Sequence, residues 1–208
     1  MPDPPEDEPD AVESHADDEP AARTRPRIVL VDGNEKRADR AKERLGDQFD
    51  LEVFSDPTEA RDSLDRLVAV LVVTASFPPA DIEELVYTAR GRSPFCHVGI
   101  LAPERSQIEE LHVPYDEAFT SPLPWGAFRK SLASMLVRAQ YLAGLQRYYT
   151  RSLALNNRRI ARSGTDPSED ETIAQMEAEL ERLEGRLNAL AAQFSHEEYR
   201  AVLERLQS

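Results

Sequence analysis

The sequence predicts an α/β protein with a doubly wound parallel sheet, followed by an all-α C-terminal part. Residues Val68–Thr74 form an unbroken apolar run, rich in Val, and the prolines Pro78 and Pro79 follow soon after it. Such a run is typical of a strand that is buried on both faces, as in a parallel sheet. Short apolar runs of this kind alternate with helical patterns five times, which is the element order of a doubly wound sheet.

The five predicted strands share short apolar or alternating patterns. They are expected at Arg27–Val31, Leu51–Phe54, Val68–Thr74, Phe95–Leu101 and Glu117–Phe119. The helices between them show apolar residues at spacings of three and four, which form one inner face. The expected inner residues are Ala38, Ala41, Leu45 and Phe49 in the first helix, Ala60, Leu64 and Leu67 in the second, Ile82, Leu85, Val86 and Ala89 in the third, and the short stretch Ile108–Leu111 in the fourth. Asp56 and Pro57 predict the start of the second helix, as cap and first-turn residue.

The C-terminal part is predicted to consist of three helices. The first follows residues 121–124 and continues to about Ala161, roughly 55 Å at 1.5 Å per residue, and residues 162–165 are expected to break it. The second begins at Asp166 and Pro167 and carries a heptad seam. The seam residues are Ile173, Met176, Leu180, Leu183, Leu187, Leu190 and Phe194. Residues 195–198 form a capping box for a last short helix, whose apolar residues are Tyr199, Val202, Leu203 and Leu206.

The charges beside the seam favour an antiparallel helical hairpin over a parallel coiled coil. A parallel homodimer would place Glu179 and Glu184 against like charges, which disfavours that pairing. The preceding long helix offers arginines instead: Arg147, Arg151, Arg158, Arg159 and Arg162. Pairing of these arginines with the glutamates of the next helix is the simpler interpretation, and contact with nucleic acid or an acidic partner is the alternative.

Composition excludes several classes of protein. The net charge of -14 and the pI near 4.8 argue against a general nucleic-acid-binding surface, and suit either a protein kept soluble at high salt or an ordinary acidic cytoplasmic one. Residues 1–25 are expected to be a disordered acidic tail. A single cysteine excludes a disulfide framework, and no apolar stretch is long enough to span a membrane.

The order and spacing of these elements resemble the response-regulator receiver domain over residues 26–138. This resemblance implies a flavodoxin-like sheet of strand order 2-1-3-4-5. Residues 139–208 resemble the HalX domain that follows receivers in halophilic archaea. That likeness rests on Leu145–Tyr149, the heptad helix, and the Phe194–Tyr199 ending.

Receivers of this family accept a phosphoryl group on an aspartate at the end of the third strand, with Mg²⁺ beside it. The resemblance places the phosphoacceptor position on Thr74, the acidic pair on Asp32 and Gly33, and the switch hydroxyl on Ala102. The family's lysine falls on Ser121, and its proline on Pro122. Only Asp32 and Pro122 keep the expected residue type.

These departures predict that phosphoryl chemistry is lost. A threonine hydroxyl without a neighbouring base is a poor nucleophile, and one carboxylate is a poor Mg²⁺ site. We therefore expect no catalytic residue, no bound metal and no cofactor. Thr74 is expected to be a locally hydrogen-bonded strand-end residue, and Asp32 a turn or helix-cap residue.

The remaining candidates favour structural roles. His97 and Cys96 are expected in the core, and Trp125 as a packing anchor, while His15, His112 and His196 are scattered along the chain. The predicted function is a non-phosphorylatable pseudo-receiver that binds other signalling proteins, such as a sensor kinase or a receiver. A transcription regulator whose helical part contacts DNA is the alternative, a working phosphotransfer enzyme is a third hypothesis, and a homodimer stays open.

Overall fold

Five parallel strands form one sheet. The computed structural model describes residues 26–161 and 167–207. The strands are β1 (Arg27–Val31), β2 (Leu51–Phe54), β3 (Val68–Thr74), β4 (His97–Ala102) and β5 (Glu117–Thr120). Their order is β2-β1-β3-β4-β5, which confirms the predicted sheet. The predictions for residues 1–25 and for the break and cap at residues 162–166 lie outside the described residues.

Strand β3 lies at the centre of the sheet and is buried along its whole length. It pairs with β1 on one side and β4 on the other, with Val73 opposite both Val31 and Ile100. Because successive side chains point to opposite faces, Leu71 belongs to one hydrophobic core and Val70 to the other. Both faces of β3 therefore need a covering layer.

Helices cover both faces of the sheet. One face holds α1 (Glu35–Leu45) and the first half of α5 (Trp125–Ala161), and the other holds α2 (Pro57–Ser63), α3 (Pro79–Arg92) and α4 (Arg105–Glu109). The predicted inner residues of α1 and α3 are buried as expected, with the exception of Phe49, which follows α1 and is only half-buried. The caps Asn34 and Asp56 accept hydrogen bonds from the backbone of the first turns of α1 and α2.

Three predicted boundaries were wrong by a few residues. Helix α2 ends at Ser63, because Leu64 takes an extended conformation with ψ of 130°, and the Asp65 carboxylate then accepts the N–H of Leu67 in a turn at 2.7 Å. Strand β4 begins at His97, two residues later than expected, and α4 ends before Leu111. Leu64 is nevertheless buried, so the apolar pattern predicted burial correctly and the helix length incorrectly.

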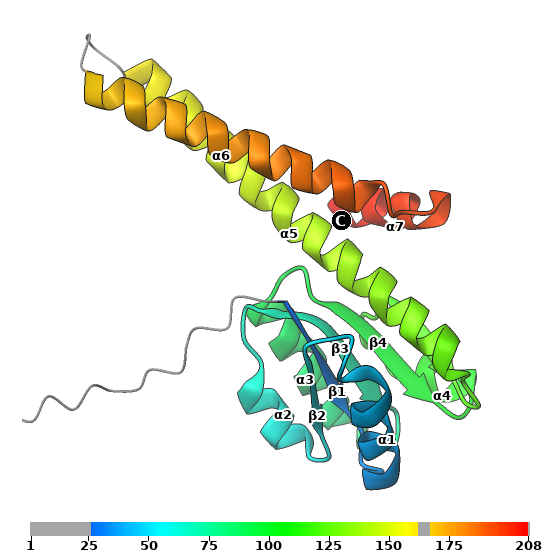
Figure 1. Ribbon diagram of the computed structural model, residues 1–208. Coiled ribbons are helices and arrows are strands. Elements are labelled where there is room, and N and C mark those ends of the chain that lie inside the picture. Colours follow the sequence, from blue (N-terminus) through cyan, green and yellow to red (C-terminus); the bar gives the residue numbers. More distant parts are fainter. Residues whose placement is uncertain (1–25, 162–166, 208) are drawn as a thin grey trace, which may run out of the picture.

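The long helix α5 is continuous through Gly144, and α6 (Pro167–Ala191) returns along it (Figure 1). A Cβ atom at Gly144 would lie 3.1 Å from Leu187 Cδ2, so the glycine allows the two helices to approach closely. Arg151 Nε lies 3.3 Å from Glu179 Oε1, and Arg159 pairs with Glu177. These contacts confirm the antiparallel hairpin.

The last helix, α7 (His196–Gln207), packs back against α5. The predicted capping box is present, since Ser195 N–H donates to Glu198 Oε2 at 2.7 Å and Glu198 N–H donates to Ser195 Oγ at 3.3 Å. Of the four apolar residues predicted for this helix only Val202 is buried. None of the described helices combines the length and the apolar character needed to cross a membrane.

A substitution at Gly99 tests the packing between the sheet and α5. A Cβ atom there would lie 2.6 Å from the Phe119 ring, and that ring is held edge-to-face against Phe128 at a centroid distance of 5.1 Å. We expect Gly99→Ala to lower the free energy of unfolding by about 1–3 kcal/mol, because the core is overpacked. The control is Gly185→Ala on α6, where the new methyl group has no neighbouring atom within 4 Å. We expect this variant to raise the free energy of unfolding by about 0.5–1 kcal/mol, because alanine has the higher helix propensity. Urea denaturation of both variants, followed by circular dichroism, measures the difference.

Candidate functional site

The carboxyl-terminal edge of the sheet holds the residues that the sequence singled out. Asp32 follows β1 directly and is 1% exposed. Its Oδ1 accepts the Asn34 N–H at 2.9 Å and Arg37 Nη2 at 2.7 Å, and its Oδ2 accepts from Arg37 Nε. Both oxygens of the carboxylate are thus bound by one guanidinium group.

The local sequence explains why Arg37 reaches Asp32. Asn34 caps α1 and its Oδ1 accepts the Arg37 N–H at 3.1 Å, which fixes Arg37 in the first turn of the helix, just above the end of β1. The hydrogen bond that Arg37 donates to Asp32 raises the pKa of Arg37, against the opposing effect of partial burial. The predicted turn role of Asp32 agrees with its contact to the Asn34 N–H. The helix cap is Asn34, and the pair with Arg37 was not predicted.

Thr74 ends β3 and is 1% exposed. Its Oγ1 shares a hydrogen bond of 2.8 Å with Ser76 Oγ, which is the local partner expected for a strand-end threonine. The loop that follows also covers Gly33, since a Cβ atom at Gly33 would lie 3.2 Å from the Phe77 ring. An aromatic side chain therefore packs beside the loop where the family's second acid would stand.

Asp32 and Ser121 line one small cavity of about 80 Å³, between α1, α5 and the sheet. Arg37 and Trp125 also line it, while Thr74 and Ala102 do not. The Ser121 N–H donates to the Ala102 carbonyl at 3.0 Å, and the Ser121–Pro122 peptide bond is cis. The structure thus brings two of the four predicted positions into a common space.

Trp125 is a packing residue, as predicted. Its ring lies edge-to-face against Phe128 at a centroid distance of 6.1 Å, and the Arg44 guanidinium lies 5.8 Å from the indole centroid. A cation over an indole face is a favourable contact. The tryptophan therefore ties the start of α5 to α1.

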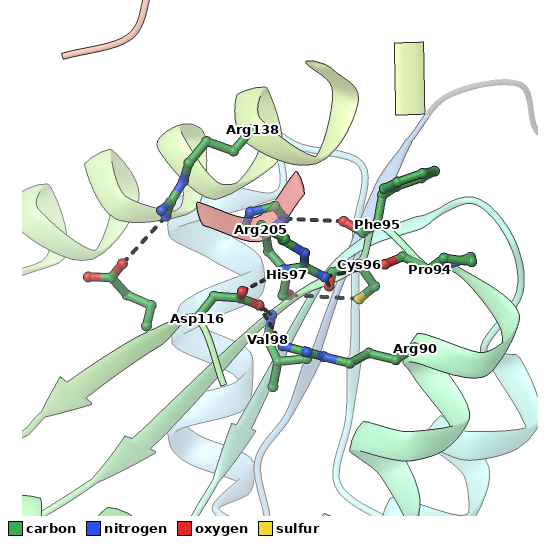
Figure 2. Close-up of polar contacts among 10 residues, drawn as sticks. Arg90, Pro94, Phe95, Cys96, His97, Val98, Asp116, Arg138 and Arg205 are labelled. Carbon is green, nitrogen blue, oxygen red and sulfur yellow. Dashed lines mark hydrogen bonds and ion pairs between the residues drawn. The ribbon is translucent and has the colours of Figure 1, made fainter. Parts of the chain in front are cut away.

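The amino-terminal edge of the sheet carries a second polar cluster, which Figure 2 shows. Asp116, directly before β5, accepts the Val98 N–H at 2.7 Å and Arg90 Nη2 at 3.0 Å on Oδ2, and Arg205 Nη1 on Oδ1. Arg205 comes from α7 and also donates to the carbonyls of Cys96 at 3.1 Å and Pro94 at 3.3 Å. We call Arg90, Asp116 and Arg205 the clasp, because they fasten α7 to the sheet.

Burial governs the titration of the groups beside the clasp. His97 is 3% exposed, its ring Nδ1 lies 3.1 Å from the Phe95 carbonyl, and burial lowers the pKa of His97 below its ordinary value. Burial alone would raise the pKa of Asp116. The combined effect of His97, the Val98 N–H, Arg205 and Arg90 is larger and opposite, so the pKa of Asp116 lies below its ordinary value. Burial raises the pKa of the Cys96 thiol to about 12, so Cys96 is a core residue and not a reactive thiolate.

Sequence reasoning missed the clasp because its parts are remote from one another. Arg205 lies 89 residues after Asp116, and no spacing rule connects an arginine in a terminal helix with an aspartate before a strand. His97 was placed correctly in the core. In the part of the chain that the structure describes, no group of three or more His, Cys, Asp or Glu side chains could hold a metal ion.

An all-parallel, five-stranded sheet of order 2-1-3-4-5 defines the flavodoxin-like doubly wound fold, which receiver domains share. No protein-family model matches the chain, and no curated protein matches it in sequence. Among solved structures, the chain is similar to an adenylate cyclase from Rhodopirellula baltica, with a TM-score of 0.54 and 16% identity over 61% of this chain and 98% of that one.

Two receiver domains are also similar to the chain. The CheY-like receiver domain protein from Methanospirillum hungatei has a TM-score of 0.49 and 15% identity, covering 56% of this chain and 98% of its own. The non-phosphorylated HemR receiver domain from Leptospira biflexa has a TM-score of 0.46 and 19% identity, covering 54% and 94%. The fold assignment rests on the sheet topology and on the similarity to the adenylate cyclase, with its TM-score of 0.54. Sequence identities this low show the fold alone.

The pair between Asp32 and Arg37 is open to a direct test of stability. Arg37→Ala leaves a buried carboxylate whose one remaining donor within the described residues is the Asn34 N–H, so we expect the free energy of unfolding to fall by about 1–3 kcal/mol. The control is Arg105→Ala, which removes an ion pair with Glu109. Both side chains of that pair are mostly exposed, so we expect its loss to lower the free energy of unfolding by at most about 0.5 kcal/mol. Equal losses in the two variants, measured by urea denaturation, would contradict a structural role for Arg37.

The depressed pKa of His97 predicts a specific dependence of stability on pH. The unfolded chain takes up a proton at His97 near pH 6.5, whereas the folded protein takes it up only at lower pH. The stability that His97 contributes is therefore complete above about pH 6.5 and decreases as the pH falls below it. We expect His97→Gln to lose less stability than the wild type between pH 7 and pH 5, and the exposed-site control His112→Gln to follow the wild type.

Proposed function

We propose that this chain is a receiver-like signalling protein that acts by binding other proteins and does not itself take up a phosphoryl group. One observation carries the proposal. At the edge of the sheet where the resemblance places Mg²⁺, both carboxylate oxygens of Asp32 are bound by Arg37. A cation supplied by the chain itself thus stands beside the acid that would hold the metal.

The residues present do not fit a magnesium site. Mg²⁺ requires oxygen ligands in near-octahedral geometry, usually from one or two carboxylates and the substrate phosphate. Here the metal would have to displace a guanidinium group from Asp32, and Gly33 supplies no second carboxylate. The Thr74 hydroxyl bonds to Ser76, and a serine hydroxyl is a poor base for activating another hydroxyl.

The proposed mode of action is a surface held in one conformation. Without a phosphoryl group, nothing at this edge shifts the population between two states. The partners would then be proteins that recognise a receiver surface, such as a sensor kinase or a receiver that still carries the aspartate. Residues 139–208, the HalX-like part, would supply a second interaction surface, and the protein would work in the cytoplasm as a regulator and not as an enzyme.

The antiparallel hairpin weakens the alternative that the helical part contacts DNA. Arg151 and Arg159 pair with Glu179 and Glu177 on α6, so these two arginines are not free to bind phosphate groups. The net charge of -14 also opposes approach to a polyanion. Protein binding therefore ranks above DNA binding for this surface.

The test is phosphorylation of the full chain. We expect incubation with Mg²⁺ and acetyl phosphate to leave the intact mass unchanged, while a receiver domain that carries the aspartate gains the mass of one phosphoryl group in the same buffer. A gain in mass that disappears in Thr74→Ala would make Thr74 a working acceptor. A gain that persists in Thr74→Ala would place the acceptor elsewhere, and either result would disprove the proposal.

A further inference from the structure

A groove with an arginine rim lies between the amino-terminal edge of the sheet and the α5–α6 hairpin. It has a volume of about 240 Å³. Its floor is apolar, with Phe95 before β4 and Leu183, Leu187 and Leu190 on α6. Figure 1 shows how α6 returns along α5 on this side of the sheet. We call this space the arginine groove.

The charge of the arginine groove is opposite to the charge of the whole protein. Four arginines line it: Arg66, Arg92, Arg147 and Arg186. None of its lining residues is acidic, although the chain has 39 acidic residues and 25 basic ones. An anionic group would therefore meet only attractive side-chain charges there.

None of the four arginines forms an ion pair with a carboxylate of the residues that the structure describes. Arg92 donates to the carbonyls of Arg61 and Leu64, at the end of α2. Arg66, Arg147 and Arg186 form no ion pair with a carboxylate in residues 26–161 and 167–207. The arginines farther along the hairpin are different, because Arg151 and Arg159 do have glutamate partners.

The acidic N-terminal segment of the chain joins the described structure at this groove. Pro26 lines the groove, so residues 1–25 leave the described structure at that point. They include nine acidic residues and two arginines, with Asp17, Asp18 and Glu19 consecutive. Pro26 is the seventh residue after Glu19, and an extended chain of that length reaches about 23 Å. A tether this short gives an effective concentration on the order of millimolar.

We propose that the acidic segment 1–25 docks in the arginine groove of its own chain, with the carboxylates of Asp17, Asp18 and Glu19 beside Arg66, Arg147 and Arg186. Docking places opposite charges in contact and covers the leucines of α6. The inference does not depend on the proposed signalling function, because it uses only the groove and the charge of the segment.

Paramagnetic relaxation in the full chain tests this docking. A nitroxide is attached to Ser14→Cys, while Cys96 is protected by burial and by its raised pKa. We expect enhanced relaxation of the backbone amides of Ala143, Arg147 and Leu187. Neutralisation of the segment by D17N/D18N/E19Q keeps the tether unchanged, and we expect it to weaken the docking equilibrium about tenfold, which corresponds to about 1.4 kcal/mol.

Matched variants of the groove separate docking from general attraction. R147Q/R186Q should weaken docking to a similar extent. R40Q/R129Q removes the same charge from exposed positions on α1 and α5 outside the groove and should leave docking nearly unchanged. Equal effects of the two double variants, or no loss with D17N/D18N/E19Q, would overturn the proposal.

A mixture of two samples identifies the chain that supplies the segment. Spin-labelled chain without isotope is mixed with unlabelled chain that carries ¹⁵N. We expect no relaxation enhancement in the mixture, because the segment docks within one molecule. Enhancement at the groove amides in the mixture would assign the groove to the segment of a second copy and would overturn docking in cis.

Discussion

The burial of β3 on both faces is the constraint on which the rest of the structure depends. All seven of its residues are buried, so each face of the sheet needs its own layer of helices. A parallel sheet also requires a crossover between successive strands, and the crossovers supply these layers. The positions of Asp32 and Thr74 follow from the same constraint, because parallel strands bring their carboxyl ends to one edge.

Helix α5 connects the sheet to the helical part of the chain. Its first half covers one face of the sheet through Phe128, Leu132 and Met135, and its second half pairs with α6. The predicted division between residues 138 and 139 falls inside this unbroken helix. The clasp then joins α7 to the sheet, through Arg205 and Asp116. The helices are therefore tied to the sheet at two places, by packing along α5 and by an ion pair from α7.

The two edges of the sheet differ in how their charges are matched. At the carboxyl edge, Arg37 neutralises the buried carboxylate of Asp32. At the amino edge, Arg90 and Arg205 neutralise Asp116, while the arginines of the groove pair with no carboxylate within residues 26–161 and 167–207. A buried carboxylate needs a partner, because burial of an unpaired charge is costly. An exposed arginine needs no partner within the protein, because water solvates its charge, and it can therefore bind an anionic group.

The sequence by itself determined the five strands, the cap of α2, the inner faces of the helices and the capping box of α7. These features depend on residues that are close in the chain, because periodicity and capping act over one or two turns. The departures at Thr74, Ala102 and Ser121 could also be noted from the sequence through its resemblance to receivers. Tertiary structure alone decided that Arg37 closes on Asp32, that α2 stops at Ser63, and that Arg205 meets Asp116. Those contacts depend on how the layers pack, and packing brings together side chains that no local spacing connects.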